Sequence, residues 1–275
     1  MERVTVALRG GGDLATGVAQ KLWRAGLRVV ILELPWPIVV RRSVALASAV
    51  WEGVFRVEDV AARRVGGPSG CAAAWARGEI PLLIDTGLES LVALRPQIFI
   101  DATLMKRNRG VHPGLAPVTI ALGPGFSAPE DADAVIETMR GHDLGRVIRE
   151  GAAAANTGMP GDVGGKTTER VLHAPCLGEV RHLRAIGDRV CAGEALLTVG
   201  GAPVHAQIDG VLRGLIAEGT VVERGNQKVG DVDPREEAVR YCFSISDKAR
   251  CLGGAVLEAC LLLGREKGVF PDDLF

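Results

Sequence analysis

The sequence predicts an α/β protein, in which a Rossmann-like sheet domain carries a small inserted all-β module and a last helix returns to the sheet domain. Three observations predict this architecture. A strand, glycine turn, helix and strand open the chain at 4–33, an internal repeat of short strands begins near residue 171, and an apolar helix follows that repeat. The expected ranges are 1–165 for the Rossmann-like domain, 170–235 for the β-module and 236–275 for the segment with the last helix.

The opening unit follows from the spacing of apolar residues. Residues 4–8 form a short apolar run that predicts a strand, and three glycines follow it directly. Leu14, Val18 and Leu22 then recur at the spacing of one helix face, and Gly26 is placed to end that helix. Residues 29–32 predict the second strand.

The glycine turn fits a dinucleotide-binding fingerprint. Gly10, Gly11 and Gly12 would let a pyrophosphate approach the backbone at the helix N-terminus, and Glu33 falls where a ribose-binding acid is expected. Asp13 opposes this interpretation because its carboxylate would repel a phosphate, although the same side chain suits an N-cap. The pattern therefore leaves open both a phosphate-binding turn and a purely structural one.

Composition describes an ordinary globular protein. The chain has 275 residues, of which 47% are hydrophobic and 24% charged, and its formal net charge is −1. No overall basic charge points to nucleic acid or to an anionic membrane, and no export signal or membrane helix is apparent, so we expect a cytoplasmic protein. The six cysteines lack zinc-site spacing, which favours buried thiols in a reducing compartment and no metal site.

Two later strands end in loops that could bind an anion. Asp101 lies in the strand at 97–103, and the basic and amide side chains of Lys106, Arg107 and Asn108 follow that strand. The strand at 118–122 runs into a second glycine turn, which contains Gly123 and Gly125. We expect these loops to share a crevice with the first glycine turn, although a solvated charge run would look the same. Further strands are predicted at 54–57 and 81–85, and further helices at 44–51 and 71–77.

A hairpin over residues 134–148 gathers four polar residues in its turn. Glu137, His142 and Asp143 are candidate acid/base groups, and Arg140 is a candidate anion ligand. The alternative is that His142 is simply an exposed loop residue.

The second half of the chain contains an internal repeat at an offset of 32. The aligned pairs are Ala174 and Ala206, Gly178 and Gly210, Gly187 and Gly219, Val190 and Val222, and Gly193 and Gly225. This texture resembles the biotinyl/lipoyl barrel-sandwich fold, in which two such halves pack face to face. Carrier members of that fold attach their cofactor to a hairpin lysine, but no lysine lies between Lys166 and Lys228, so a carrier function is excluded.

The last helix is predicted over residues 249–263, with Ser246 or Asp247 as its N-cap. Apolar positions surround nearly the whole helix, which predicts burial. We expect the helix to pack on the N-terminal sheet, because a small β-module alone could not cover it.

Several sequence blocks together resemble one family, the YqeB-like accessory proteins of selenium-dependent molybdenum hydroxylase systems. The blocks lie at 12–17, 135–147, 156–161, 230–235 and 245–249. The resemblance implies an N-terminal part related to the XdhC-like Rossmann domain, whose relatives handle molybdenum cofactor while molybdenum hydroxylases mature. It implies no established role for any single residue.

Three functions are compatible with these patterns. The first is an accessory protein that binds molybdenum cofactor, or a nucleotide, in the crevice near Gly10, Lys106 and Gly123, and that acts on a partner hydroxylase. The second is an NAD(P)-dependent oxidoreductase, with Glu33 on the ribose and Glu137 or His142 as acid/base. The third is a non-catalytic scaffold. The sequence leaves open whether the protein is an enzyme and whether it forms a homo-oligomer.

Overall fold

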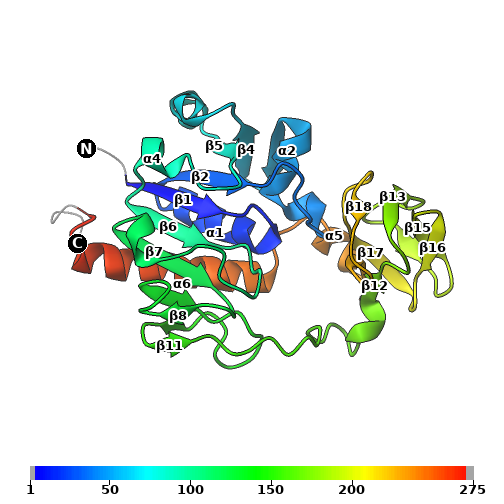
Figure 1. Cartoon of the computed structure of the whole chain (residues 1–275). Coiled ribbons are helices and arrows are strands. Elements are labelled where there is room, and N and C mark those ends of the chain that lie inside the picture. The colour runs from blue at the N-terminus through cyan, green and yellow to red at the C-terminus, as the bar shows by residue number, and fades with distance from the viewer. Residues whose placement is uncertain (1–3, 271–275) are drawn as a thin grey trace. The chain divides into compact units, whose positions relative to one another are not determined.

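The structure is a computed structural model that describes residues 4–270, and the chain forms two compact units (Figure 1). Unit 1 comprises Met1–Pro37, Leu46–Asn156 and Ile245–Phe275, and unit 2 comprises Ile38–Ala45 and Thr157–Ser244. The chain therefore leaves unit 1 twice and returns to it twice. The outermost residues of the expected ranges, 1–3 and 271–275, lie outside the described part.

Unit 1 is built on one large mixed sheet. Among the described residues it has nine strands in the order β10-β9-β7-β6-β1-β2-β5-β4-β3. All neighbours from β4 to β9 pair in parallel, and only the edge strands β3 and β10 are antiparallel. The strands are β1 (Thr5–Arg9), β2 (Arg28–Glu33), β3 (Val54–Val57), β4 (Val60–Arg64), β5 (Ile80–Ile84), β6 (Ile98–Asp101), β7 (Val118–Leu122), β9 (Ala134–Ile136) and β10 (Val147–Ile148). A two-stranded sheet of β8 (Ser127–Ala128) and β11 (Gly151–Ala152) completes the unit's strands.

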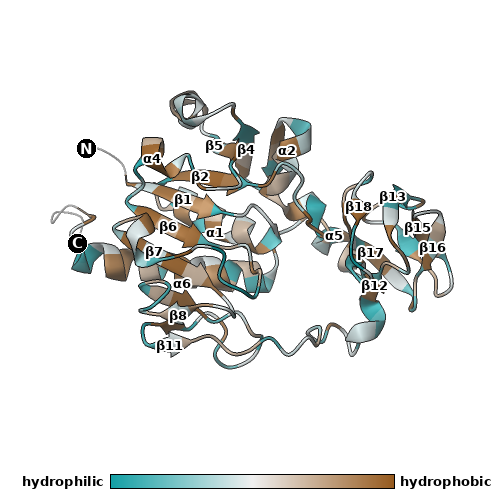
Figure 2. Cartoon of the chain, in the orientation of Figure 1, coloured by the Kyte–Doolittle hydropathy of each residue, from teal (hydrophilic) through white to brown (hydrophobic). Residues whose placement is uncertain are grey.

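The α/β class that the sequence predicts is confirmed, because helices cover a sheet whose central strands are buried on both faces. Figure 2 shows these strands as the most hydrophobic part of the unit. The helices of unit 1 are α1 (Asp13–Arg24), α2 (Ala49–Glu52), α3 (Cys71–Ala76), α4 (Leu91–Leu94) and α6 (Asp247–Glu266), with short 3₁₀ turns at Leu46–Ser48, Pro68–Gly70 and Pro113–Leu115.

Two glycines allow α1 and α6 to pack closely. A Cβ built at Gly17 would lie 2.4 Å from the carbonyl oxygen of Ala249, and one built at Gly253 would lie 2.5 Å from that of Gly17. Real Cβ atoms do not approach backbone so closely, so any larger residue would push the helices apart. Helix α6 also contacts β7, β9 and β10, which places it on the same face of the sheet as α1.

The prediction that α6 is buried all round is only partly right. Ser246 supplies the expected N-cap, since its hydroxyl accepts a 3.2 Å hydrogen bond from the Ala249 amide. The outer side of the helix, however, carries Leu257, Leu261 and the 40% exposed Leu262 along an open groove. Helix α1 and the sheet cover one side of α6, whereas the groove on its other side is open among residues 4–270.

The prediction of one helix over residues 44–51 is wrong. The structure has 3₁₀ turns at Arg42–Val44 and Leu46–Ser48, and only then the short α2. Two backbone amides of this segment bond to the first glycine turn region: Leu46 donates to the Thr16 hydroxyl (2.9 Å) and Ala47 to the Gly11 carbonyl (2.8 Å). These tertiary hydrogen bonds replace the helical ones that the alanine-rich sequence favours.

Unit 2 contains two four-stranded antiparallel sheets, in the orders β12-β19-β17-β14 and β16-β15-β13-β18. Its elements are β12 (Val171–His173), β13 (Gly178–His182), β14 (Arg189–Val190), β15 (Ala195–Val199), β16 (Ala202–His205), β17 (Gly210–Leu215), β18 (Val221–Val222), β19 (Lys228–Asp233) and α5 (Ala238–Tyr241), with 3₁₀ turns at Arg42–Val44 and Thr168–Arg170. An apolar core lies between the sheets, and Val180, Leu197 and Leu212 belong to it.

The 32-residue repeat appears in the strand pairing of unit 2. Gly178 pairs with Val222, and Gly210 pairs with Val190. Gly178 and Gly210 are equivalent in the repeat, and so are Val190 and Val222. The two pairs are therefore equivalent, and in each pair a strand of one half bonds to a strand of the other half. The segment Ile38–Ala45 also belongs to unit 2. It packs closely on β17, because a Cβ at Gly214 would lie 2.8 Å from the carbonyl oxygen of Val40.

Candidate functional site

The first glycine turn joins β1 to α1 in a constrained conformation. Gly10 has φ +93° and donates to the Leu32 carbonyl, and a Cβ at Gly11 would lie 2.9 Å from the Ala47 nitrogen. Gly12 is the N-cap of α1, so Asp13 is the first residue of the helix. The expectation that Asp13 caps the helix is therefore wrong, although a carboxylate in the first turn still complements the helix dipole.

Glu33 braces this turn from the end of β2. One carboxylate oxygen accepts from the Gly11 amide at 2.7 Å and the other from the Leu34 amide at 2.8 Å. Glu33 is 8% exposed, and burial raises its pKa while the two amide hydrogen bonds oppose the rise. The Gly11 amide thus donates to Glu33 in this structure and is not available to a phosphate.

The loop after β6 is held by Asp101 and Asn108. Asp101 is buried, pairs with Arg9 at 3.3 Å and accepts from the amide and hydroxyl of Thr103. The side-chain amide of Asn108 donates to the carbonyl of Val111 and to the carboxylate of Asp131, the latter at 2.6 Å. Its side-chain oxygen accepts from the amide of Val111. Both side chains therefore have structural partners inside the loop.

Lys106 and Arg107 are exposed in the same loop, next to the second glycine turn. A Cβ at Gly125 would lie 2.5 to 2.7 Å from the backbone of these two residues, and one at Gly123 would lie 2.8 Å from the Thr138 hydroxyl. A Cβ at Gly10 would in turn lie 3.4 Å from Ala102. The loops after β1, β6 and β7 are therefore neighbours along one edge of the sheet, as the sequence predicts, and the loop after β9 joins them there.

The candidate acid/base residues are close in sequence but are not joined by hydrogen bonds. Glu137 is buried, and its two oxygens accept from the amides of Met139 and Ala154, each at 2.7 Å. His142 and Asp143 are exposed in the turn, and the described structure shows no hydrogen bond between His142 and either acid. Arg140 forms a bidentate pair with Asp247 at 2.9 and 3.0 Å. In this arrangement Glu137 organises the hairpin.

Lys248 is a charged residue of this region that the sequence did not single out as a site. Burial lowers its pKa, and so does the nearby charge of Arg140, while Asp13, Glu137 and Asp247 oppose the shift. The ammonium has no hydrogen bond or ion pair among residues 4–270. Lysine is scarce in the chain, which has six, but only the return of α6 to unit 1 places Lys248 among the predicted site residues.

A cavity of about 500 Å³ opens at the carboxyl ends of the parallel strands. Arg9 ends β1, Thr86 follows β5, and the loop after β6 contributes Arg109 and His112. Leucines of α4 and its flanking loops form the apolar part of the wall. Strand-end cavities in parallel sheets are the usual ligand sites of α/β proteins.

The polar groups of this cavity are mostly donors. Arg9 is fixed by Asp101 and by the Arg109 carbonyl (2.9 Å), whereas the Arg109 guanidinium has no partner among the described residues. The Nδ1 atom of His112 accepts from the Gly114 amide at 3.1 Å, so the neutral ring carries its proton on Nε2. Two arginines and an imidazole N–H give the cavity the character of an anion site.

The described residues contain no group of three or more His, Cys, Asp or Glu side chains that could hold a metal ion. The expectation of buried thiols is met by Cys71, Cys242 and Cys260, whereas Cys191 and Cys251 are exposed. Within residues 4–270, no helix has the length and apolar character to span a membrane.

No family model matches the sequence. The chain is 45% identical over 258 residues to the uncharacterized protein YqeB of Escherichia coli (strain K12). The match covers 94% of this chain and 47% of YqeB, so the chain spans about half the length of that relative. This similarity supports the resemblance to YqeB-like proteins that the sequence blocks indicate.

Two solved structures resemble the chain weakly. An aspartoacylase family protein from Mesorhizobium loti has a TM-score of 0.28 and 14% identity, over 86% of this chain and 87% of that one. The ectoine utilization protein EutE (DoeB) from Ruegeria pomeroyi has a TM-score of 0.24 and 9% identity, over 85% and 87%. Both TM-scores are too low to support an argument about fold or function.

Proposed function

We propose that the chain is an accessory protein for the maturation of a selenium-dependent molybdenum hydroxylase, and that it binds molybdenum cofactor or a nucleotide at the carboxyl edge of the unit 1 sheet. The similarity to YqeB across 94% of the chain supports the family resemblance on which this proposal rests. The partner is the hydroxylase that receives the cofactor.

The observation that carries the proposal is the cavity lined by Arg9, Arg109 and His112. Molybdopterin carries a phosphate, and its nucleotide forms carry two, so each of these ligands needs cationic donors. Arg109 offers a planar guanidinium that matches a phosphate in bidentate geometry, and His112 offers its Nε2 proton. The ligand's ring system would lie on the leucine wall of the cavity.

The finer fold assignments belong to the same proposal. In unit 1, the chain runs from β1 outward through β2 to β5 on one side of the sheet, and then returns to β6 and β7 on the other side of β1. The boundary between β1 and β6 is thus a topological switch point, where Rossmann-like domains bind ligands. In unit 2, the exchanged strands of the two repeat halves support a barrel-sandwich module. Because that module has no hairpin lysine, its proposed role is contact with the partner protein.

The experiment is mass spectrometry of the intact protein purified under native conditions from cells with and without molybdopterin synthesis. We expect a pterin-sized adduct only in the first case. Arg109→Ala should lose the adduct, whereas Arg77→Ala, at an exposed position of the same unit, should keep it. An unchanged adduct in Arg109→Ala would remove the cavity as the site, and NADH binding in place of a pterin would favour an oxidoreductase.

A further inference from the structure

Helix α6 carries an apolar face that no element of residues 4–270 covers. A groove of about 510 Å³ lies on its outer side, and the residues that line it are Gly254, Leu257, Glu258, Leu261, Leu262 and Arg265. Leu262 is 40% exposed, and a Cβ built at Gly254 would meet nothing within 4 Å. Leucines gathered along an open groove are typical of a surface that binds another protein chain.

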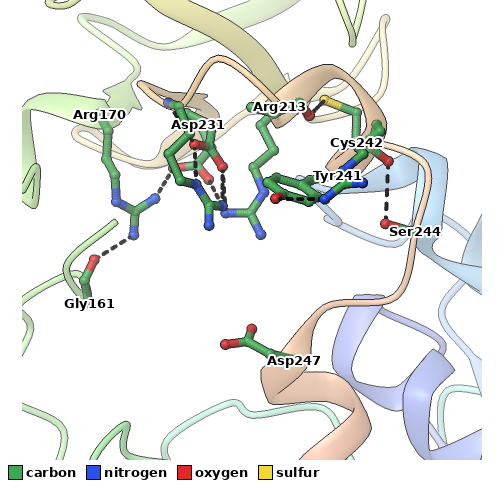
Figure 3. A network of polar contacts seen from close by, with 12 residues as sticks. Gly161, Arg170, Arg213, Asp231, Tyr241, Cys242, Ser244 and Asp247 are labelled. Carbon is green, nitrogen blue, oxygen red and sulfur yellow. Dashed lines mark hydrogen bonds and ion pairs between the residues drawn. The ribbon is translucent and has the colours of Figure 1, made fainter. Parts of the chain in front are cut away.

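Glu258 differs from the other acids of α6 in having no partner. Asp247 begins the helix (Figure 3) and pairs with Arg140 at 2.9 Å. Glu266 ends the helix and pairs with Arg149 at 2.7 Å. Among residues 4–270, Glu258 makes no hydrogen bond or ion pair, and its side chain is exposed beside the leucines. Its carboxylate is therefore available to a cation outside the described chain.

The two charged residues of the groove lie symmetrically about its leucines. Glu258 comes three residues before Leu261, and Arg265 comes three residues after Leu262. A spacing of seven residues is close to two helical turns, so both charges lie on the same face of α6, about 10 Å apart along its axis. The face thus has a negative end, a positive end and leucines between them.

Such a face is complementary to a second copy of itself. If two α6 helices pack antiparallel about a twofold axis between Leu261 and Leu262, Glu258 of each copy lies opposite Arg265 of the other. A parallel pair would instead set each charge against its own kind. Arg265 already has an interaction within its own chain, but a guanidinium has five N–H donors and can bind a second carboxylate as well.

We propose that the outer face of α6 is a homodimer interface, in which two chains pack antiparallel. Leu257, Leu261 and Leu262 form its apolar centre, and two pairs of Glu258 with Arg265 lie at its ends. The leucines supply most of the affinity, while the charge pairs fix the direction and register, because exposed ion pairs contribute little by themselves. One helix face is a small interface, so the dimer should dissociate on dilution within the micromolar range. This inference does not depend on the ligand proposed for unit 1.

The test is sedimentation velocity of the full chain over a range of concentrations, in which we expect a monomer–dimer equilibrium. Glu258→Arg and Arg265→Glu should each weaken association roughly tenfold, since each turns both attractive pairs of a twofold interface into repulsive ones. The double variant restores opposite charges at both ends and should associate within about threefold of the wild type. The control Glu150→Arg makes the same charge reversal at an exposed position outside the groove and should associate as the wild type does.

Leu262→Gln tests the apolar centre at a side chain that is already exposed. It should weaken association roughly tenfold, whereas Leu183→Gln, at a 55% exposed leucine of unit 2, should not. Thermal unfolding at concentrations where the wild type is monomeric should give similar temperatures for all variants, which separates a lost interface from a damaged fold. If Arg265→Glu is unstable, Glu258→Arg and Leu262→Gln still decide the question. A wild type that stays monomeric, a double variant no better than the single ones, or association unchanged by Leu262→Gln would overturn the proposal.

Discussion

The carboxylate of Glu33 accepts a 2.7 Å hydrogen bond from the amide of Gly11, so the acid that ends β2 holds the glycine turn after β1. Removing it leaves the buried Gly11 amide and the partly buried Leu34 amide without their acceptor. We expect Glu33→Ala to lower the free energy of unfolding by about 1–3 kcal/mol. Urea unfolding measures this, and Glu150→Ala, at an exposed glutamate, is the control.

The pH dependence of stability should also report Glu33. Because burial raises its pKa, the folded chain holds this proton more tightly than the unfolded chain does. The contribution to the free energy of unfolding is therefore largest below the unfolded pKa of about 4.3 and falls as pH rises through the folded pKa. The side chain of Glu33→Gln does not titrate, so this variant does not lose stability through ionisation of residue 33. Its free energy of unfolding relative to the wild type should therefore rise between about pH 4.3 and the folded pKa of Glu33. A difference that does not change with pH would contradict the assignment.

The close packing of α1 on α6 can be tested with alanine substitutions at two adjacent glycines of α6, only one of which faces α1. Gly253→Ala would place a Cβ 2.5 Å from the Gly17 carbonyl oxygen, so we expect a loss of about 1–3 kcal/mol. A Cβ at Gly254 meets nothing within 4 Å, so Gly254→Ala should gain about 0.5–1 kcal/mol from helix propensity alone. Chemical denaturation of both variants checks the sign, and equal effects would show that the close contact is unimportant.

Lys248 should be unusually reactive toward acylating reagents. Its lowered pKa leaves more neutral amine near neutral pH than an ordinary lysine has. Lys267, which pairs with Asp133 at 2.6 Å, is the internal reference. Competitive labelling with peptide mass spectrometry should show faster modification at Lys248, and Asp13→Asn should increase it further because the Asp13 charge raises that pKa. Slower labelling of Lys248 than of Lys267 would contradict this.

The thiols should separate into two classes. Burial raises the pKa of Cys71 to about 11 and that of Cys260 to about 12, whereas Cys191 and Cys251 are exposed. We expect the exposed pair to react with a thiol reagent in the native protein, and the buried pair only after denaturation. Native modification of Cys260 would show that α6 opens readily.

Local patterns were enough to predict the first strand, helix and strand, since each depends on residues that are neighbours in the chain. The segment at 44–51 was mispredicted because its amides bond to Thr16 and Gly11, which are distant in sequence. The repeat of unit 2 was also visible in sequence, because glycines and valines mark its equivalent turns and strand ends.

The site was harder to predict, because a polar side chain in a loop can bind either a ligand or the loop itself. Asn108 and Glu137 were candidate ligand or catalytic residues, and both bind backbone amides. Arg109 ends the predicted basic run and His112 follows three residues later, but only the folded loop shows that they line a cavity. Lys248 joins this region through a helix at the far end of the chain.

The contact between Gly17 and Gly253 also fixes an order of events during translation. Helix α1 is synthesised before unit 2, and the helix that packs against it is synthesised after all of unit 2. A nascent chain, or one cut before Ile245, therefore lacks the helix that packs against α1, and we expect it to be cleaved by proteases faster than the full chain. Unit 1 can therefore complete the packing of α1 against α6 only once synthesis has passed unit 2.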